Sequence, residues 1–168
     1  EVHWRAFLES LQARGMRGVE YVVSDDHAGL HAAHRAVLSG AKWQRCQFHL
    51  AQNAIHHAPG IAIRKRIGTE LRAAWTPNPL AAAETELADL VSSYHETAPK
   101  LAKWLVQNVP EGLTVFTLPE YHRRRMRTSN PMDRAVQQEL KRRTQKVRVF
   151  PNEASLNRLV SAVLVEID

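Results

Sequence analysis

The sequence has only one cysteine, Cys46, among 168 residues, and it contains no long apolar run. A single cysteine excludes an internal disulfide framework, which fits a reducing compartment such as the cytoplasm. No stretch approaches the roughly 18 consecutive apolar residues of a membrane-spanning helix, and residues 1–20 lack the features of a secretory signal peptide. We therefore expect a cytoplasmic protein with no membrane partner.

Acidic residues are scarce in one part of the chain. Between Tyr121 and Phe150, ten Lys and Arg stand against Asp133 and Glu139, which gives +8; the whole chain carries +6, so the remainder carries −2. Such a basic segment is typical of a surface that contacts phosphates, although many charged runs are only solvated faces. The candidate DNA-binding residues are Arg123, Arg124, Arg125, Arg127, Arg134, Lys141, Arg142, Arg143 and Lys146.

Apolar periodicity predicts an α/β order in the first third of the chain. A stripe at helical spacing indicates a helix over 2–16. The β-branched run 21–23 indicates a buried strand that leads into a helix over 27–38. A strand over 41–48 and a helix over 50–57 are expected next. Helices and strands in this alternating order favour a parallel sheet, so the fold class is α/β.

The rest of the chain is expected to be predominantly helical. Asn130 followed by Pro131 is typical of a helix start. The expected elements are helices over 61–75, 80–97 and 99–109, an extended segment over 112–119, a basic loop over 121–130, and helices over 130–145 and 154–167.

Asp25 follows the expected strand at the point where the next helix begins. Ligands of open α/β sheets gather at the carboxyl ends of strands, so a carboxylate there is well placed for catalysis or metal binding. The alternative is that Asp25 or Asp26 only caps the following helix, which is a common role of Asp.

Cys46 and His49 stand in C-x-x-H spacing further along the chain. Thiolate and imidazole are zinc ligands, but two ligands do not make a structural zinc site, and there is no second cysteine. A small zinc-binding protein is therefore only an alternative interpretation of this pair.

Two ordered blocks of motif residues lie towards the two ends of the chain. The first follows V-S-D-x-H-x-G-L, a helix, and W-Q-R-C-x-x-H-x-x-x-N; its residues are Val23, Ser24, Asp25, His27, Gly29, Leu30, Trp43, Gln44, Arg45, Cys46, His49 and Asn53. The second follows T-N-x-x-E, K-R-R-T and F-P-N-x-x-S-x-x-R-L-V; its residues are Ser129, Asn130, Asp133, Lys141, Arg142, Arg143, Thr144, Phe150, Pro151, Asn152, Ser155, Arg158, Leu159 and Val160. Together the blocks resemble the mutator-type transposases of bacterial insertion sequences.

The resemblance implies a partial ribonuclease H-like core with an all-α insertion, and a D-D-E set of acids that binds Mg²⁺. By position, Asp25 matches the second acid and Asp133 the third, where the family has Glu; both would be metal ligands. Glu139 is the fallback acid. The motif residues that would support the site are His27, Cys46 and His49.

The same resemblance divides the chain into three parts. Residues 1–58 correspond to the second half of the core, residues 59–118 to the helical insertion, and residues 119–168 to the basic loop and C-terminal helices of the core. The first acid is expected upstream, so these 168 residues are expected to be an inactive fragment on their own.

The implied activity is DNA transposition, in which insertion-sequence ends are cut and joined by metal-dependent phosphoryl transfer. DNA with inverted repeats would be the partner, the intact transposase would be a homo-oligomer, and it would work at the bacterial nucleoid. The main alternative is a non-catalytic DNA-binding remnant that uses the basic segment.

Overall fold

The computed structural model describes residues 2–76, 79–147 and 149–167, without the side chains of residues 132, 133 and 167. The chain divides into two compact units, Glu1–Ser129 and Asn130–Asp168. None of the helices in the described ranges is both long and apolar enough to cross a membrane.

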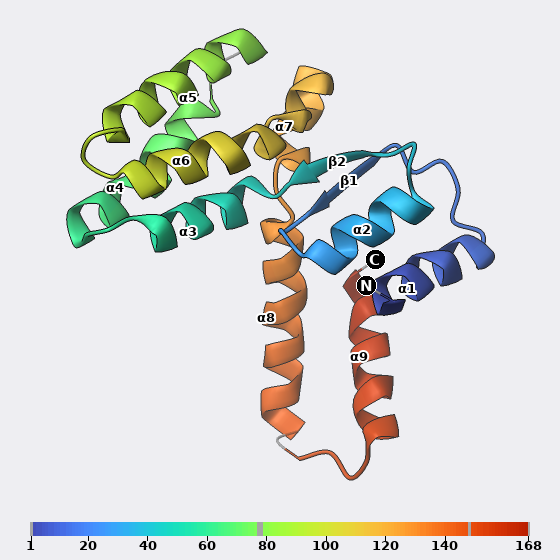
Figure 1. The fold of residues 1–168 in the computed structure, drawn as a ribbon. Coiled ribbons are helices and arrows are strands. Elements are labelled where there is room, and N and C mark those ends of the chain that lie inside the picture. Colours follow the sequence, from blue (N-terminus) through green and yellow to red (C-terminus); the bar gives the residue numbers. More distant parts are fainter. Residues whose placement is uncertain (1, 77–78, 148, 168) are drawn as a thin grey trace. The chain divides into compact units, whose positions relative to one another are not determined.

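The first unit begins with the predicted alternation of helices and strands (Figure 1). Strands β1 and β2 pair in parallel, with Tyr21 opposite Lys42 and Ser24 opposite Arg45. Helix α2 makes the crossover between them, and α1 packs beside α2. The elements are α1 (Val2–Ala13), β1 (Tyr21–Ser24), α2 (Ala28–Val37), β2 (Lys42–Arg45) and α3 (Gln47–His57).

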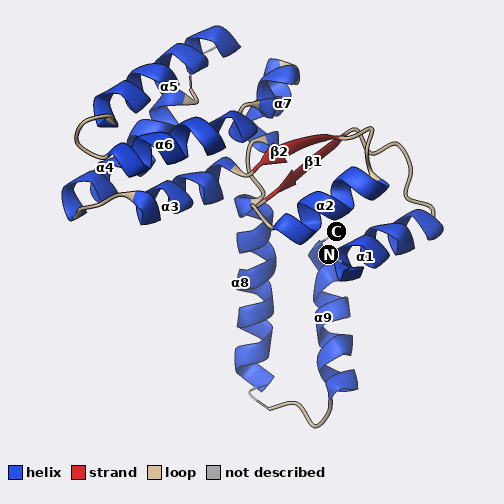
Figure 2. Cartoon of the chain, in the orientation of Figure 1, coloured by secondary structure: helices blue, strands red, loops and turns tan. Residues whose placement is uncertain are grey.

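Helical elements make up the rest of the first unit (Figure 2). Its hydrophobic core joins α3 to three of these helices through fully buried side chains such as Leu50, Ile67, Leu101 and Leu105. The elements are α4 (Ile61–Ala74), α5 (Leu80–Tyr94), α6 (Pro99–Asn108), the 3₁₀ turns η1 (Val109–Gly112) and η2 (Thr114–Thr117), and α7 (Glu120–Met126).

Two sequence expectations in this unit are wrong. Residues 112–119 do not form an extended segment, because the buried Gln44 amide accepts from the Val115 backbone N–H at 2.6 Å and holds the chain in a tight turn. The basic segment also does not begin as a loop, since α7 occupies Glu120–Met126. An acid in its first turn and arginines in its last turn suit the helix dipole.

The second strand is shorter than expected and ends at Arg45, so His49 lies on α3.

The second unit is a helical hairpin of α8 (Asn130–Val147) and α9 (Glu153–Ile167), which run antiparallel (Figure 1). Asn152 accepts a hydrogen bond from the Ser155 backbone N–H at 2.9 Å and so caps α9. Both helices agree with the predicted ranges to within two residues. With its small parallel sheet, the chain is α/β and predominantly helical, as the sequence predicted.

Candidate active site

Asp25 lies directly after β1, at the carboxyl end of the parallel pair. Its side chain is exposed, and its carboxylate makes no hydrogen bond or ion pair with any residue in the described ranges. The alternative role as a helix cap is wrong, because His27 caps α2: the Leu30 backbone N–H donates to His27 Nδ1 at 3.2 Å. The carboxylate of Asp25 is therefore available to a ligand.

Asp26, the neighbouring acid, is held by the buried Arg45. Arg45 Nη2 lies 3.0 Å from Asp26 Oδ2, and Arg45 Nη1 lies 2.9 Å from Glu111 Oε2 and 2.8 Å from Asn108 Oδ1. The Arg45 side chain is only 2% exposed. A buried guanidinium that joins three acceptors therefore fastens the end of β1 to the α6–η1 segment.

The sequence pattern predicts no function for Arg45 beyond its place in the motif. Its signal in the sequence is a charged residue at the end of a strand, two residues after the apolar Trp43 and directly before Cys46. Such a position is costly for a cation unless acceptors surround it, so Arg45 points to a polar network. The identity of Asn108 and Glu111 as acceptors has no signal in the local sequence.

Gln44 is a second buried polar residue of β2. Its side-chain amide donates to the Gly112 carbonyl at 2.8 Å and to the Arg45 carbonyl at 2.7 Å, and it accepts from Tyr21 Oη at 3.2 Å in addition to Val115 N. All of its hydrogen-bonding capacity is therefore used. Gln44 and Arg45 together position the turns η1 and η2 against the sheet.

Cys46 is the N-cap residue of α3 and is completely buried. Its backbone N–H donates to the Ser24 carbonyl at 2.7 Å, and its Sγ lies 3.2 Å from Thr128 Oγ1. Burial raises the pKa of the Cys46 thiol, but hydrogen bonds with Thr128, His49 and Ser129 outweigh this and lower the pKa to about 7. The contact places the end of the first unit's chain beside the carboxyl ends of both strands.

The Cys46 thiol is expected to make stability depend on pH. Its pKa is about 7 in the folded state and about 9.0 without these contacts. A depressed folded-state pKa contributes stability that is complete above pH 9 and is lost as the pH falls through 7. We therefore expect the wild type to gain stability relative to Cys46→Ser as the pH rises. The difference between their unfolding free energies should increase by about 1–2 kcal/mol from pH 7 to 9. Urea unfolding at several pH values measures this difference, and a flat difference would contradict the assignment.

His49 lies one helical turn after Cys46 on α3. Its Nδ1 atom is buried and has no hydrogen-bond partner in the described part of the chain. No group of three or more His, Cys, Asp or Glu side chains in that part could hold a metal ion. The described contacts of Cys46 are with hydroxyl and backbone groups.

The basic residues of α7 have different surroundings. Arg123 is half-buried, and its guanidinium donates to the Leu118 carbonyl at 2.8 Å and the Phe116 carbonyl at 3.2 Å. Arg124, Arg125 and Arg127 are exposed, and their side chains have no hydrogen-bond or ion-pair partner among the residues that the structure describes. These three arginines are therefore available for phosphates, whereas Arg123 also holds the preceding turn.

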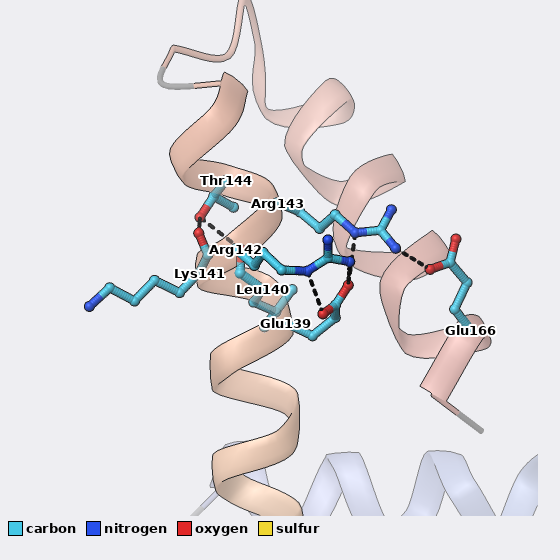
Figure 3. Close-up of polar contacts among 7 residues, drawn as sticks. All are labelled: Glu139, Leu140, Lys141, Arg142, Arg143, Thr144 and Glu166. Atoms are coloured by element: carbon cyan, nitrogen blue, oxygen red, sulfur yellow. Dashed lines mark hydrogen bonds and ion pairs between the residues drawn. The ribbon is translucent and has the colours of Figure 1, made fainter.

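In α8, part of the predicted DNA-binding set is already paired (Figure 3). Glu139 lies 2.5 Å from Arg142 Nη2 and 2.8 Å from Arg143 Nε, and Arg143 also lies 2.5 Å from Glu166 on α9. Hydrogen bonds from Arg142 and then Arg143 lower the pKa of Glu139 to about 2. The fallback acid is therefore an ion-pair partner in this structure.

The remaining predicted site residues lie on the same helix. Arg134, Lys141 and Lys146 are exposed. Asp133 belongs to α8, but its side chain lies outside the described residues.

Comparison with known proteins defines the family. The family model described as Transposase, Mutator family matches residues 1–168, and the chain belongs to this family. It is 47% identical over 168 residues to the transposase for insertion sequence element IS406 of Burkholderia multivorans. It is 40% identical over 166 residues to that for ISRM5 of Rhizobium meliloti, and 31% identical over 170 residues to that for IS256 in transposon Tn4001 of Staphylococcus aureus.

These alignments cover nearly all of this chain but less than half of each relative. The chain is matched over 100%, 97% and 99% of its length, whereas 43%, 40% and 43% of the respective relatives are covered. The family assignment therefore confirms the resemblance drawn from the two motif blocks.

Proposed function

We propose that this chain is the part of an insertion-sequence transposase that supplies the second catalytic carboxylate, Asp25, and much of the DNA-contacting surface. The observation that carries the proposal is the position of Asp25: exposed, unpaired with described residues, and at the carboxyl end of two parallel strands. The parallel pair and its helical crossover are consistent with part of a ribonuclease H-like sheet, and α4–α6 with the insertion between the second and third acids.

The donor chemistry at Asp25 fits Mg²⁺. This ion prefers carboxylate oxygen and is commonly bound through one or two carboxylates together with substrate phosphates and water. When bound, Mg²⁺ would stabilise negative charge on the attacking and leaving oxygens of a phosphoryl transfer. Asp25 would contribute one ligand, and Asp133 is proposed as the third acid of the set.

The protein's own contribution at this site is positioning. Arg45 holds Asp26 and thereby fixes the turn that carries Asp25. The Cys46 backbone N–H holds the Ser24 carbonyl, which fixes the strand end from the other side. These contacts keep the Asp25 backbone in place while its carboxylate remains accessible to metal and DNA.

DNA contact is proposed for the exposed arginines of α7 and the basic residues of α8. Phosphate contacts of this type are independent of sequence and weaken steeply with salt. The intact transposase is proposed to act as a homo-oligomer that brings two element ends together. Recognition of particular inverted repeats is not assigned to any residue in this chain.

Substitution of Glu139 by Gln is expected to tighten DNA binding. The change removes one negative charge and releases Arg142 and Arg143 from the carboxylate. We expect DNA affinity to rise about two- to fivefold at low salt, with a steeper dependence on salt. Fluorescence anisotropy with labelled duplex DNA measures this, with Glu153→Gln on α9 as the charge-matched control. Equal effects of both substitutions would show that net charge alone is responsible.

The proposed function is tested with the complete reading frame in which this sequence lies. The expressed protein is incubated with insertion-sequence end DNA, with and without Mg²⁺, and strand cleavage is followed on gels. Cleavage that requires Mg²⁺ is the expected result. DNA binding without cleavage would favour the non-catalytic DNA-binding alternative. The 168-residue chain alone is expected to bind DNA without cutting it.

A further inference from the structure

A polar pocket of about 260 Å³ lies between α7 and the C-terminal end of α4. Three of its lining residues are arginines of the α7 segment, and one is an acid, so these ionised side chains give the wall a net charge of +2. The residues that line the pocket include Gln47, Trp75, Glu120, Arg123, Arg124 and Arg127. All of them belong to the first unit.

The arginines of the pocket differ in what they can offer a ligand. Arg123 donates to backbone carbonyls and so contributes mainly its charge. Arg124 and Arg127 are exposed and have no side-chain partner in the described ranges. Two guanidinium groups on one pocket wall match the oxygens of a phosphate, because each presents a planar fork of N–H donors.

Trp75 also lines the pocket. The residue is only 4% exposed, and its indole Nε1 has no acceptor among the described residues. Because Trp75 lines the pocket, its indole N–H resonance can report a ligand that enters the pocket.

The backbone holds the pocket in a defined shape. The Gln47 backbone N–H donates to the Arg127 carbonyl at 3.0 Å, and the Gln47 side chain donates to the Gly112 carbonyl at 2.9 Å. Gln47 is also the first residue of α3, whose N-terminal end carries partial positive charge. The pocket is thus fixed to the same strand–helix junction that carries Cys46.

We propose that this pocket, whose lining does not include Asp25, binds a phosphate group through Arg124 and Arg127. The ligand chemistry is a phosphate mono- or diester, and the source is either the DNA backbone or a small phosphate compound. Assignment to the DNA backbone rests on the proposed function, whereas the phosphate site itself does not. A phosphate held here would anchor DNA at a fixed point beside the helical insertion.

The test follows the indole N–H resonances of the ¹⁵N-labelled chain. The protein has four tryptophans, and the Trp75 signal is identified by its loss in Trp75→Phe. Inorganic phosphate and a 12-nucleotide single- or double-stranded DNA are titrated separately. We expect the Trp75 resonance to shift with DNA, and the DNA affinity to fall about tenfold in Arg124→Gln/Arg127→Gln with loss of that shift.

Arg125→Gln is the control for each single substitution, Arg124→Gln and Arg127→Gln, because it removes the same one charge. Arg125 lies between the two arginines in sequence, is exposed, and does not line the pocket. The control should retain the Trp75 shift, and an equal loss of that shift in Arg125→Gln would overturn the proposal.

A Trp75 shift with inorganic phosphate but not with DNA would support the site and identify a small phosphate compound as its ligand. DNA binding without any Trp75 shift would overturn the pocket and leave the proposed function standing. Absence of both DNA binding and a phosphate-induced shift would overturn both.

Discussion

Asp25→Asn in the complete transposase is expected to reduce Mg²⁺-dependent cleavage of end DNA by about a thousandfold or more. The amide keeps the size of the carboxylate, but it replaces one acceptor oxygen by an NH2 donor and loses the negative charge that a hard cation prefers. Because Asp25 is exposed and caps no helix, the fold should be unchanged. Cleavage rates under single-turnover conditions measure the effect, with DNA affinity measured in parallel.

Asp26→Asn provides the matched control for this substitution. It makes the same change one residue later, at a carboxylate that pairs with Arg45 and is 47% exposed. We expect about a tenfold loss of rate from the loosened turn, far smaller than the loss at Asp25. Equal losses at the two positions would contradict Asp25 as the metal ligand. Loss of DNA binding in Asp25→Asn would also contradict it, because the substitution removes a negative charge from the site.

Arg45→Met is expected to lower the unfolding free energy of the chain by about 2–4 kcal/mol. Breaking a buried ion pair typically costs about 3–5 kcal/mol. The cost is reduced here because Asp26 and Glu111 are 47% and 38% exposed and can be hydrated once Arg45 is gone. The unfolding free energy of Arg45→Lys should fall between those of the wild type and Arg45→Met. One ammonium group cannot reach all three acceptors in the same planar arrangement. Urea unfolding followed by tryptophan fluorescence measures these values.

Arg35→Met is the control for Arg45. Arg35 lies on α2, is exposed, and makes no hydrogen bond or ion pair with the part of the chain that the structure describes. Its loss should change the unfolding free energy by no more than about 0.5 kcal/mol. A loss below about 1 kcal/mol in Arg45→Met would show that the network contributes little. In that case Asp26 would also have little effect on the position of Asp25.

Local sequence patterns were sufficient for most of the secondary structure. The β-branched run at 21–23 and the apolar stripe of the first helix gave elements that the structure confirms to within a few residues. The failures are at 112–119 and 121–130, where the local composition is ambiguous. There a buried side-chain amide from Gln44 holds residues 114–117 in a turn, and α7 forms where a loop was expected.

In the candidate site, too, local sequence patterns identify some residues, whereas contacts between residues distant in sequence define the others. Asp25 could be proposed as a site residue because a carboxylate after an apolar β-branched strand is a local pattern. The motif blocks predicted the family that the comparison confirmed. The role of Arg45 could not be found, since its partners Asn108 and Glu111 lie more than sixty residues away in sequence. The same is true of the contact between Cys46 and Thr128.

The sequence by itself determined the family, the helical and strand periods, and the basic segment, because each depends on neighbouring residues. Tertiary structure alone decided which charges are free. It paired Arg143 with Glu166 on α9, turned Arg123 towards backbone carbonyls, and left Asp25 and Arg124 exposed. The physical reason is that burial and ion pairing depend on groups brought together through space, and spacing along the chain does not specify them.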